Sequence, residues 1–149
     1  MTKRNLRFAC MVLALIAAAS GLTSGAGAAP PTGVAAAGRS AFVGDTPLVA
    51  RLPGHRLDLP AAAVRCINCH APSAGTAGQT PFAPLLTSRY LNELRARRGG
   101  PGSRYDPASF CRVLREGIDP AGVMVDTAMP RYSLSTRGCD DLWAYVNSQ

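Results

Sequence analysis

The sequence is poor in several features that mark common classes of enzyme and binding protein. Apart from the histidines, Lys3 is the only basic residue that is not an arginine, and basic residues are not interleaved with aromatic ones. A formal net charge of +7 without that pattern does not indicate nucleic-acid binding. No pair of carboxylates, serine–histidine–aspartate set or phosphate-binding loop is recognisable. The sequence therefore favours neither a nucleic-acid partner nor a hydrolytic or phosphoryl-transfer site.

The chain also lacks an apolar run long enough for a membrane span. The amino-terminal apolar run covers residues 8–22, which is shorter than the ~20 residues needed to cross a bilayer. Three basic residues precede this run and the small residues 26–28 follow it, as in a secretory signal peptide. We expect export to the periplasm, cleavage near Ala28 and no membrane anchor afterwards. The predicted organisation is a signal peptide at residues 1–28, a flexible segment at 29–37 and one domain at 38–149.

The most informative motif is Cys66-Ile67-Asn68-Cys69-His70. Two cysteines separated by two residues, with a histidine directly after the second, form the attachment signature of c-type haem. Each thiol adds across one vinyl group of the porphyrin, and the intervening turn places His70 under the iron as proximal ligand. A zinc site would need a second ligand pair, which the chain lacks, and a thioredoxin-like motif would not need the histidine. We therefore predict one covalent haem c on Cys66 and Cys69, with a chance match as the alternative.

The iron of such a haem has one further axial position. Met124 and Met129 are the only methionines beyond the predicted signal peptide, and a thioether ligand raises the reduction potential of haem iron. Pro130 restricts the backbone directly after Met129, whereas Met124 lies between two valines, as a packing residue would. Met129 is the predicted distal ligand and Met124 the alternate, with His55 ranked far behind both.

Two further cysteines of the mature chain, Cys111 and Cys139, lie outside the haem motif. Cys10 would be removed with the signal peptide. Export to an oxidising compartment favours a disulfide between Cys111 and Cys139, and two buried free thiols are the alternative.

Helix start and stop signals recur along the domain. We expect a short helical turn at residues 38–44, an ordered loop at 45–60 and a helix from about residue 58 into the haem motif. Further helices are predicted at residues 88–98, where arginines 95, 97 and 98 suit the last turn, and at 106–117 and 139–147. No run of alternating apolar and polar residues predicts a strand. The expected fold class is therefore all-α.

The combined motifs resemble the class I c-type cytochrome family. The resemblance rests on residues 66–70, on the segment Met129-Pro130-Arg131-Tyr132 and on residues 142–146, and it covers roughly residues 38–149. It implies a cytochrome c-like helical domain wrapped around one covalent haem, with a C-terminal aromatic helix packed across the helix that leads into the haem motif. Residues 114–122 are also similar to segments of cytochrome domains that serve periplasmic dehydrogenases.

The motif and the resemblance predict an electron carrier rather than an enzyme. Axial ligands on both faces of the iron leave no position for a substrate, and the expected partners are periplasmic electron donor and acceptor proteins. Two alternatives stay open. The first is a haem-based ligand-binding or sensing protein with a labile sixth ligand, and the second is a cytochrome subunit docked permanently to a periplasmic dehydrogenase.

Overall fold

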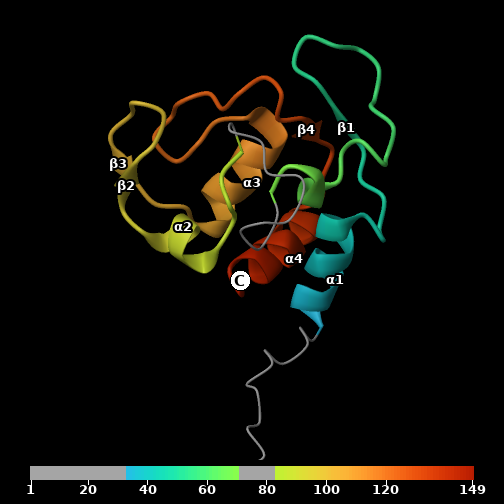
Figure 1. Cartoon of the computed structure of the whole chain (residues 1–149), viewed down its shortest axis with the longest axis horizontal. Helices are drawn as coiled ribbons and strands as arrows, with labels where there is room; N and C mark the ends of the chain where they lie inside the picture. Colours follow the sequence, from blue (N-terminus) through green and yellow to red (C-terminus); the bar gives the residue numbers. More distant parts are fainter. Residues whose placement is uncertain (1–32, 71–82) are drawn as a thin grey trace, which may run out of the picture.

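The structure is a computed structural model that describes residues 33–70 and 83–149. The helices α1 and α4 lie side by side (Figure 1). The two pairs of short strands lie at opposite ends of the molecule (Figure 1). No helix in these residues is long and apolar enough to cross a membrane. In chain order the elements are α1 (Val34–Val43), β1 (Ala50–Arg51), the 3-10 helix η1 (Cys66–Asn68), α2 (Ser88–Asn92), β2 (Arg95–Ala96), β3 (Gly102–Ser103), α3 (Pro107–Glu116), β4 (Arg131–Tyr132) and α4 (Thr136–Val146).

The prediction of an all-α fold is wrong. The described residues form four α-helices and two antiparallel sheets of two strands each. In one sheet Ala50 of β1 lies opposite Tyr132 of β4, and in the other Arg95 of β2 lies opposite Ser103 of β3. Each strand is two residues long, which is too short for an alternating pattern to be recognised in the sequence.

Helix α3 has strong local signals at both ends, and the prediction of a helix at residues 106–117 is confirmed. The side chain of Asp106 accepts a hydrogen bond from the backbone N–H of Ser109 at 2.7 Å, and Pro107 occupies the first helical position, where no N–H partner is needed. Gly117 ends the helix with φ at 75°, a conformation that glycine adopts without strain. These signals lie within the helix itself, so the sequence alone suffices to locate it.

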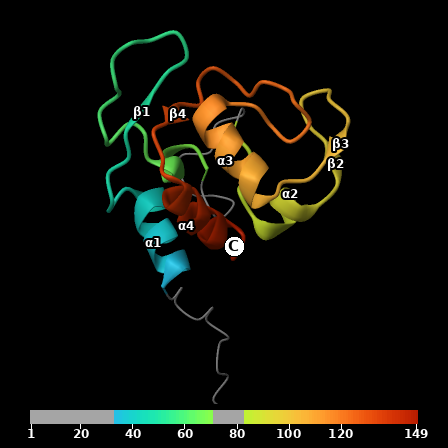
Figure 2. The same cartoon turned by 180° about the vertical axis from the view of Figure 1, so that it is seen from behind.

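Helix α4 forms the centre of the fold because it packs against both α1 and α3 (Figure 2). It begins at Thr136, earlier than the predicted start at residue 139, because Ser135 caps it by accepting from the N–H of Gly138 at 3.1 Å. Gly38 of α1 lies so close to the backbone of Asp141 that a side chain there would overlap the Asp141 carbonyl. Glycine is therefore what allows the two helices to approach so closely.

Two predicted helices differ from the observed structure. The helix expected at 88–98 ends at Asn92, because the Tyr90 carbonyl accepts from Arg97 Nη2 at 2.7 Å and the Leu91 carbonyl accepts from Tyr105 N at 2.9 Å. These donors come from outside α2 and replace the next turn of helix. The helix expected from residue 58 is a series of turns followed by η1. The turn predicted at 38–44 is the end of the longer helix α1.

A disulfide joins α3 to α4. Cys111 and Cys139, the pair expected to be bridged, have an S–S distance of 2.04 Å and a Cα–Cα distance of 5.3 Å. The ring of Phe110 lies 5.5 Å from that of Trp143, so aromatic packing accompanies the covalent link between the same two helices.

Candidate functional site

A cavity of about 640 Å³ lies among η1, α3, α4 and the strand β4. This volume falls within the roughly 300–1,000 Å³ typical of cofactor and ligand sites. Its walls are mainly apolar, with Phe110, Val113 and Leu114 from α3 and Leu142 and Val146 from α4. These five side chains are buried in the core of the protein, so the cavity borders that core.

The four predicted haem-attachment and ligand residues line this one cavity: Cys66, Cys69, His70 and Met129. Met124, the alternate ligand, is 61% exposed and does not line the cavity. His55 is also exposed and lies outside the lining. The structure therefore brings together residues that are far apart in the sequence and leaves the two lower-ranked candidates elsewhere.

The side chain of His70 is oriented by the backbone of Pro84. Its Nδ1 lies 2.8 Å from the Pro84 carbonyl oxygen, and because a carbonyl can only accept, Nδ1 carries the proton. The other nitrogen, Nε2, is then left with a free lone pair, which is the arrangement found in metal-binding histidines. Burial lowers the pKa of His70, and the hydrogen bond to Pro84 opposes this only in part. His70 is therefore a neutral imidazole with one nitrogen available as a ligand.

The turn between the two cysteines is closed by backbone hydrogen bonds. The Cys66 carbonyl accepts from the N–H of Cys69 at 3.1 Å and from that of His70 at 2.8 Å. Both cysteines are free thiols, Cys66 buried and Cys69 exposed. Burial raises the pKa of the Cys66 thiol to about 11, whereas the nucleophilic cysteine of a thiol–disulfide oxidoreductase has a lowered pKa. The site therefore does not have the electrostatics of a thioredoxin-like centre.

Met129 is held in place from two directions. Its N–H donates to the Asp126 carbonyl at 3.1 Å, and its own carbonyl accepts from Arg131 Nη1 at 2.6 Å. The Arg131 guanidinium in turn lies directly against Gly117, where a side chain would overlap it. The strand β4 begins at Arg131 and is paired with β1, so the sheet that sequence reasoning missed fixes the segment directly after Met129.

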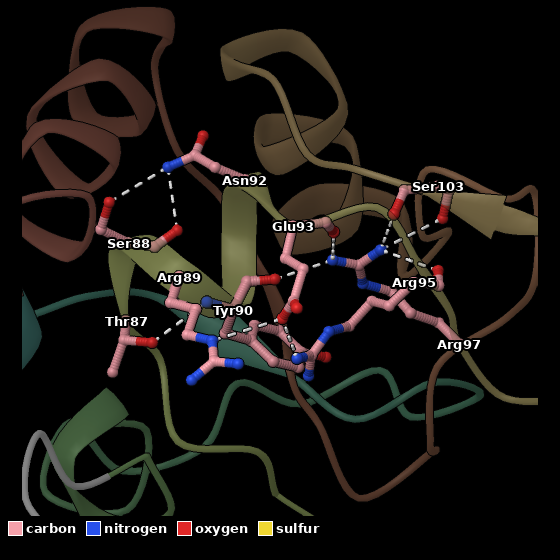
Figure 3. A network of polar contacts seen from close by, with 9 residues as sticks. All are labelled: Thr87, Ser88, Arg89, Tyr90, Asn92, Glu93, Arg95, Arg97 and Ser103. Atoms are coloured by element: carbon pink, nitrogen blue, oxygen red, sulfur yellow. Dashed lines mark hydrogen bonds and ion pairs between the residues drawn. The ribbon is translucent and has the colours of Figure 1, made fainter.

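Sequence reasoning also missed a cluster of arginines and tyrosines on the cavity wall. Arg95, Arg97 and Arg98 line the cavity instead of ending a helix. Arg97 is 5% exposed, and its guanidinium lies 5.3 Å and 5.0 Å from the ring centres of Tyr90 and Tyr105. Figure 3 shows how Arg97 reaches the backbone of Tyr90 and Ser103. A hairpin signal, the glycines directly after Arg98, is the only local feature that could have indicated this arrangement.

Among residues 33–70 and 83–149, no group of three or more histidine, cysteine, aspartate or glutamate side chains is placed to hold a bare metal ion. No family model, curated protein or solved structure matches the chain. The chemistry of the cavity is therefore the basis for assigning a function.

Proposed function

We propose that this protein is a periplasmic electron-transfer protein that carries one electron on a single covalently attached haem c. Cys66 and Cys69 would form the thioether links, and His70 and Met129 would hold the iron. The observation that carries this proposal is the cavity, which gathers these four residues and no other candidate ligand named from the sequence. The resemblance of the same segments to class I c-type cytochromes supports it.

The residues around the cavity fit a haem. Its apolar walls suit the porphyrin faces, its two thiols are unbridged, and a neutral imidazole and a thioether are present for the iron. The haem would supply the Fe(III)/Fe(II) couple and four of the six iron ligands, and the protein supplies the rest of the environment. The chain itself supplies the Pro84 carbonyl that orients His70 and the thioether of Met129. The core of α3 and α4 excludes water.

Two axial ligands from the protein favour an electron carrier over an enzyme. If His70 and Met129 both hold the iron, they would leave no coordination position for a substrate. The soft sulfur of Met129 favours ferrous iron and raises the reduction potential. The partners of such a carrier are periplasmic donor and acceptor proteins, and export is supported by the pattern of residues 1–28.

The test is the visible spectrum of the purified, matured protein in its ferrous form, before and after addition of CO. We expect a low-spin spectrum that CO does not change. Met129→Ala should bind CO and lower the reduction potential, whereas Met124→Ala, the matched control, should do neither because Met124 lies outside the cavity. Haem should resist extraction by acidified solvent unless both Cys66 and Cys69 are replaced.

Three results would contradict the proposal. Absence of covalent haem from the matured protein would remove its basis. Rapid binding of CO to the unsubstituted protein would show a labile sixth position and favour a ligand-sensing function instead. An unchanged reduction potential in Met129→Ala would mean that Met129 is not a ligand.

A further inference from the structure

Arg97 carries a buried positive charge that no carboxylate of the described chain neutralises. It is 5% exposed and lines the cavity, and the ion pairs among the described residues involve Arg39, Arg51, Arg89 and Arg95 but not Arg97. All nine acidic residues of the sequence lie within the described ranges. A buried charge without a paired counter-ion costs several kcal/mol, so Arg97 is suited to an anionic partner in the cavity.

The hydrogen bonds of Arg97 leave one donor free. Nη2 donates to the Tyr90 carbonyl at 2.7 Å, and Nη1 donates to the carbonyl of Ser103 and, at 3.3 Å, to that of Arg95 (Figure 3). These carbonyls satisfy hydrogen bonds but carry no net charge. Nε is buried and has no partner. The guanidinium is thus fixed by its two terminal nitrogens, and its third donor position remains available to a ligand.

The charged groups around Arg97 make this wall of the cavity basic. Arg95, on the strand β2, pairs with Glu93 and also has a buried Nε without a partner. Arg98, in the following turn, is exposed at the cavity edge. Burial raises the pKa of Tyr105, so its hydroxyl is neutral at ordinary pH. Tyr90 contributes its ring.

Two acidic residues line the same cavity, Asp119 and Asp126, and the Asp126 carboxylate accepts through Oδ1 from the N–H of Ala128 at 2.8 Å. Asp119 lies beyond the end of α3 and accepts hydrogen bonds through Oδ1 from the N–H groups of Ala121 and Val123, at 2.9 and 2.8 Å. No ion pair joins it to Arg97 among the described residues. In the described part of the chain, four arginines therefore line the cavity (Arg65, Arg95, Arg97 and Arg98) with two aspartates, each hydrogen-bonded within its own loop. Glu93, which pairs with Arg95, is not part of the lining.

We propose that Arg97, with Arg95 beside it, binds an ionised carboxylate of the molecule in this cavity, namely a propionate of the haem. The inference rests on the proposed function, because the propionates are the anionic groups of that cofactor. Arg97 Nε–H would donate to the carboxylate while the Nη atoms keep their bonds to the backbone. Charge-assisted hydrogen bonds of this kind are among the strongest in proteins. The hairpin of β2 and β3 then has a role, which is to hold a cation against the cofactor.

The positive charge of Arg97 allows binding of a propionate to be distinguished from a purely structural role of this residue. A positive charge near the haem disfavours the more positive ferric state, so removal of the charge should lower the reduction potential. Removal should also raise the pKa of the propionate, because its ionised form loses a stabilising cation. An arginine that only holds the backbone of Tyr90 and Ser103 would leave the pKa of the propionate unchanged, so the pH dependence of the potential separates the two roles.

The experiment uses the matured, haem-loaded full chain and compares Arg97→Met with Arg97→Lys. The control is Arg104→Met, which removes an exposed arginine just after β3. The reduction potential is measured by spectroelectrochemistry between pH 5 and pH 9. We expect Arg97→Met to lower the potential and to make it fall with rising pH as the propionate ionises. Arg97→Lys, which keeps the charge, should restore most of the potential, and Arg104→Met should resemble the unsubstituted protein.

A second measurement needs no substitution at Arg97 and remains decisive if Arg97→Met does not fold. Haem made from a precursor labelled with carbon-13 at the propionate carboxyls is examined by redox-difference infrared spectroscopy. We expect label-sensitive bands of an ionised, hydrogen-bonded carboxylate that persist at pH 5. Label-sensitive bands of a protonated acid at pH 5 would overturn the proposal, as would an Arg97→Met protein with unchanged potential and pH profile. In either case normal haem attachment and resistance to CO would leave the proposed function intact, so the two failures can be told apart.

Discussion

Arg131 is the residue that connects the predicted distal ligand to the rest of the protein. It donates to the Met129 carbonyl at 2.6 Å, and its guanidinium lies against Gly117 at the end of α3. Burial lowers the pKa of Arg131, and its Nη2 is buried without a hydrogen-bond partner. A residue two positions after the proposed ligand thus helps to hold the backbone of Met129.

Arg131→Gln should loosen the segment that carries Met129. A hydrogen bond from a charged donor contributes about 1.5–3 kcal/mol, so we expect CO to bind the ferrous variant at least tenfold faster than the unsubstituted protein. Arg137→Gln, at an exposed position of α4, is the control. Equal CO association rates in Arg131→Gln and in the control would mean that the sheet β1–β4 holds Met129 without Arg131.

Cys66 leads to a second prediction at this scale, for the haem-free chain. Because burial raises the pKa of Cys66 to about 11, its thiol is fully protonated at neutral pH, and only the thiolate reacts readily with alkylating agents. Alkylation of Cys66 should therefore accelerate about tenfold for each pH unit up to about pH 11. The measurement is mass spectrometry of peptides after timed alkylation, with unfolded protein as control. A Cys66 that reacts in the folded chain as fast as in the unfolded chain would contradict this.

At the scale of the elements, Gly38 allows α1 to cross α4 closely. Gly38→Ala would gain roughly 1 kcal/mol of helix propensity, but the new methyl group would overlap the Asp141 carbonyl. Overpacking of this kind costs typically 1–3 kcal/mol, and main-chain atoms cannot rotate away as a side chain can. We expect a net loss of stability of about 1–2 kcal/mol.

The control for Gly38→Ala is Gly138→Ala, in α4. There a methyl group would meet only the ends of the Leu134 and Ser135 side chains, at 3.3 and 3.5 Å, so the variant should be neutral or slightly more stable. Urea denaturation of both variants measures the difference. Equal stabilities would show that the helices can separate without cost.

The elements differ in how far the sequence determines them. Helix α3 could be predicted because Asp106, Pro107 and Gly117 define both its ends locally. The end of α2 could not, because the donors that end it, from Arg97 and Tyr105, belong to later segments. The strands β1 and β4 are brought together by tertiary contacts, among them the hydrogen bond from the Tyr132 hydroxyl to the Val64 carbonyl at 2.8 Å.

The same distinction applies to the site. The spacing of Cys66, Cys69 and His70 is a property of five consecutive residues, so the motif could be recognised without a fold. The carbonyl of Pro84 and the buried charge of Arg97 depend on where the backbone passes in space. Local chemistry therefore predicts which residues would contact the proposed cofactor, and the groups that orient these residues or balance charge emerge only from the fold.

At the scale of the whole molecule, one covalent link joins the two helices that form the apolar wall of the cavity. The Cys111–Cys139 disulfide connects α3 to α4 with a sequence separation of 28 residues. Cys139 is 1% exposed and Cys111 is half-buried, so the bridge enters the interior at its α4 end. Because Phe110 and Trp143 also pack between these helices, the wall has a noncovalent contact that does not depend on the disulfide.

Replacement of both cysteines, in the variant Cys111→Ala/Cys139→Ala, should therefore reduce stability without removing the site. Closing a loop of this length lowers the entropy of the unfolded chain by an amount worth about 3–4 kcal/mol. We expect the midpoint of urea unfolding of the haem-loaded protein to fall accordingly, while the ferrous spectrum and its resistance to CO stay unchanged.

A reducing agent provides the internal comparison for this variant, because it should lower the stability of the unsubstituted protein by a similar amount once the bridge opens. The agent should have no effect on the variant, which has no bridge to lose. A loss below about 1 kcal/mol in both cases would mean that contacts such as that between Phe110 and Trp143 already restrict the unfolded chain. Entry of CO into the variant would instead mean that the bridge keeps the cavity wall in place, so the two roles of the disulfide are separated by one spectrum.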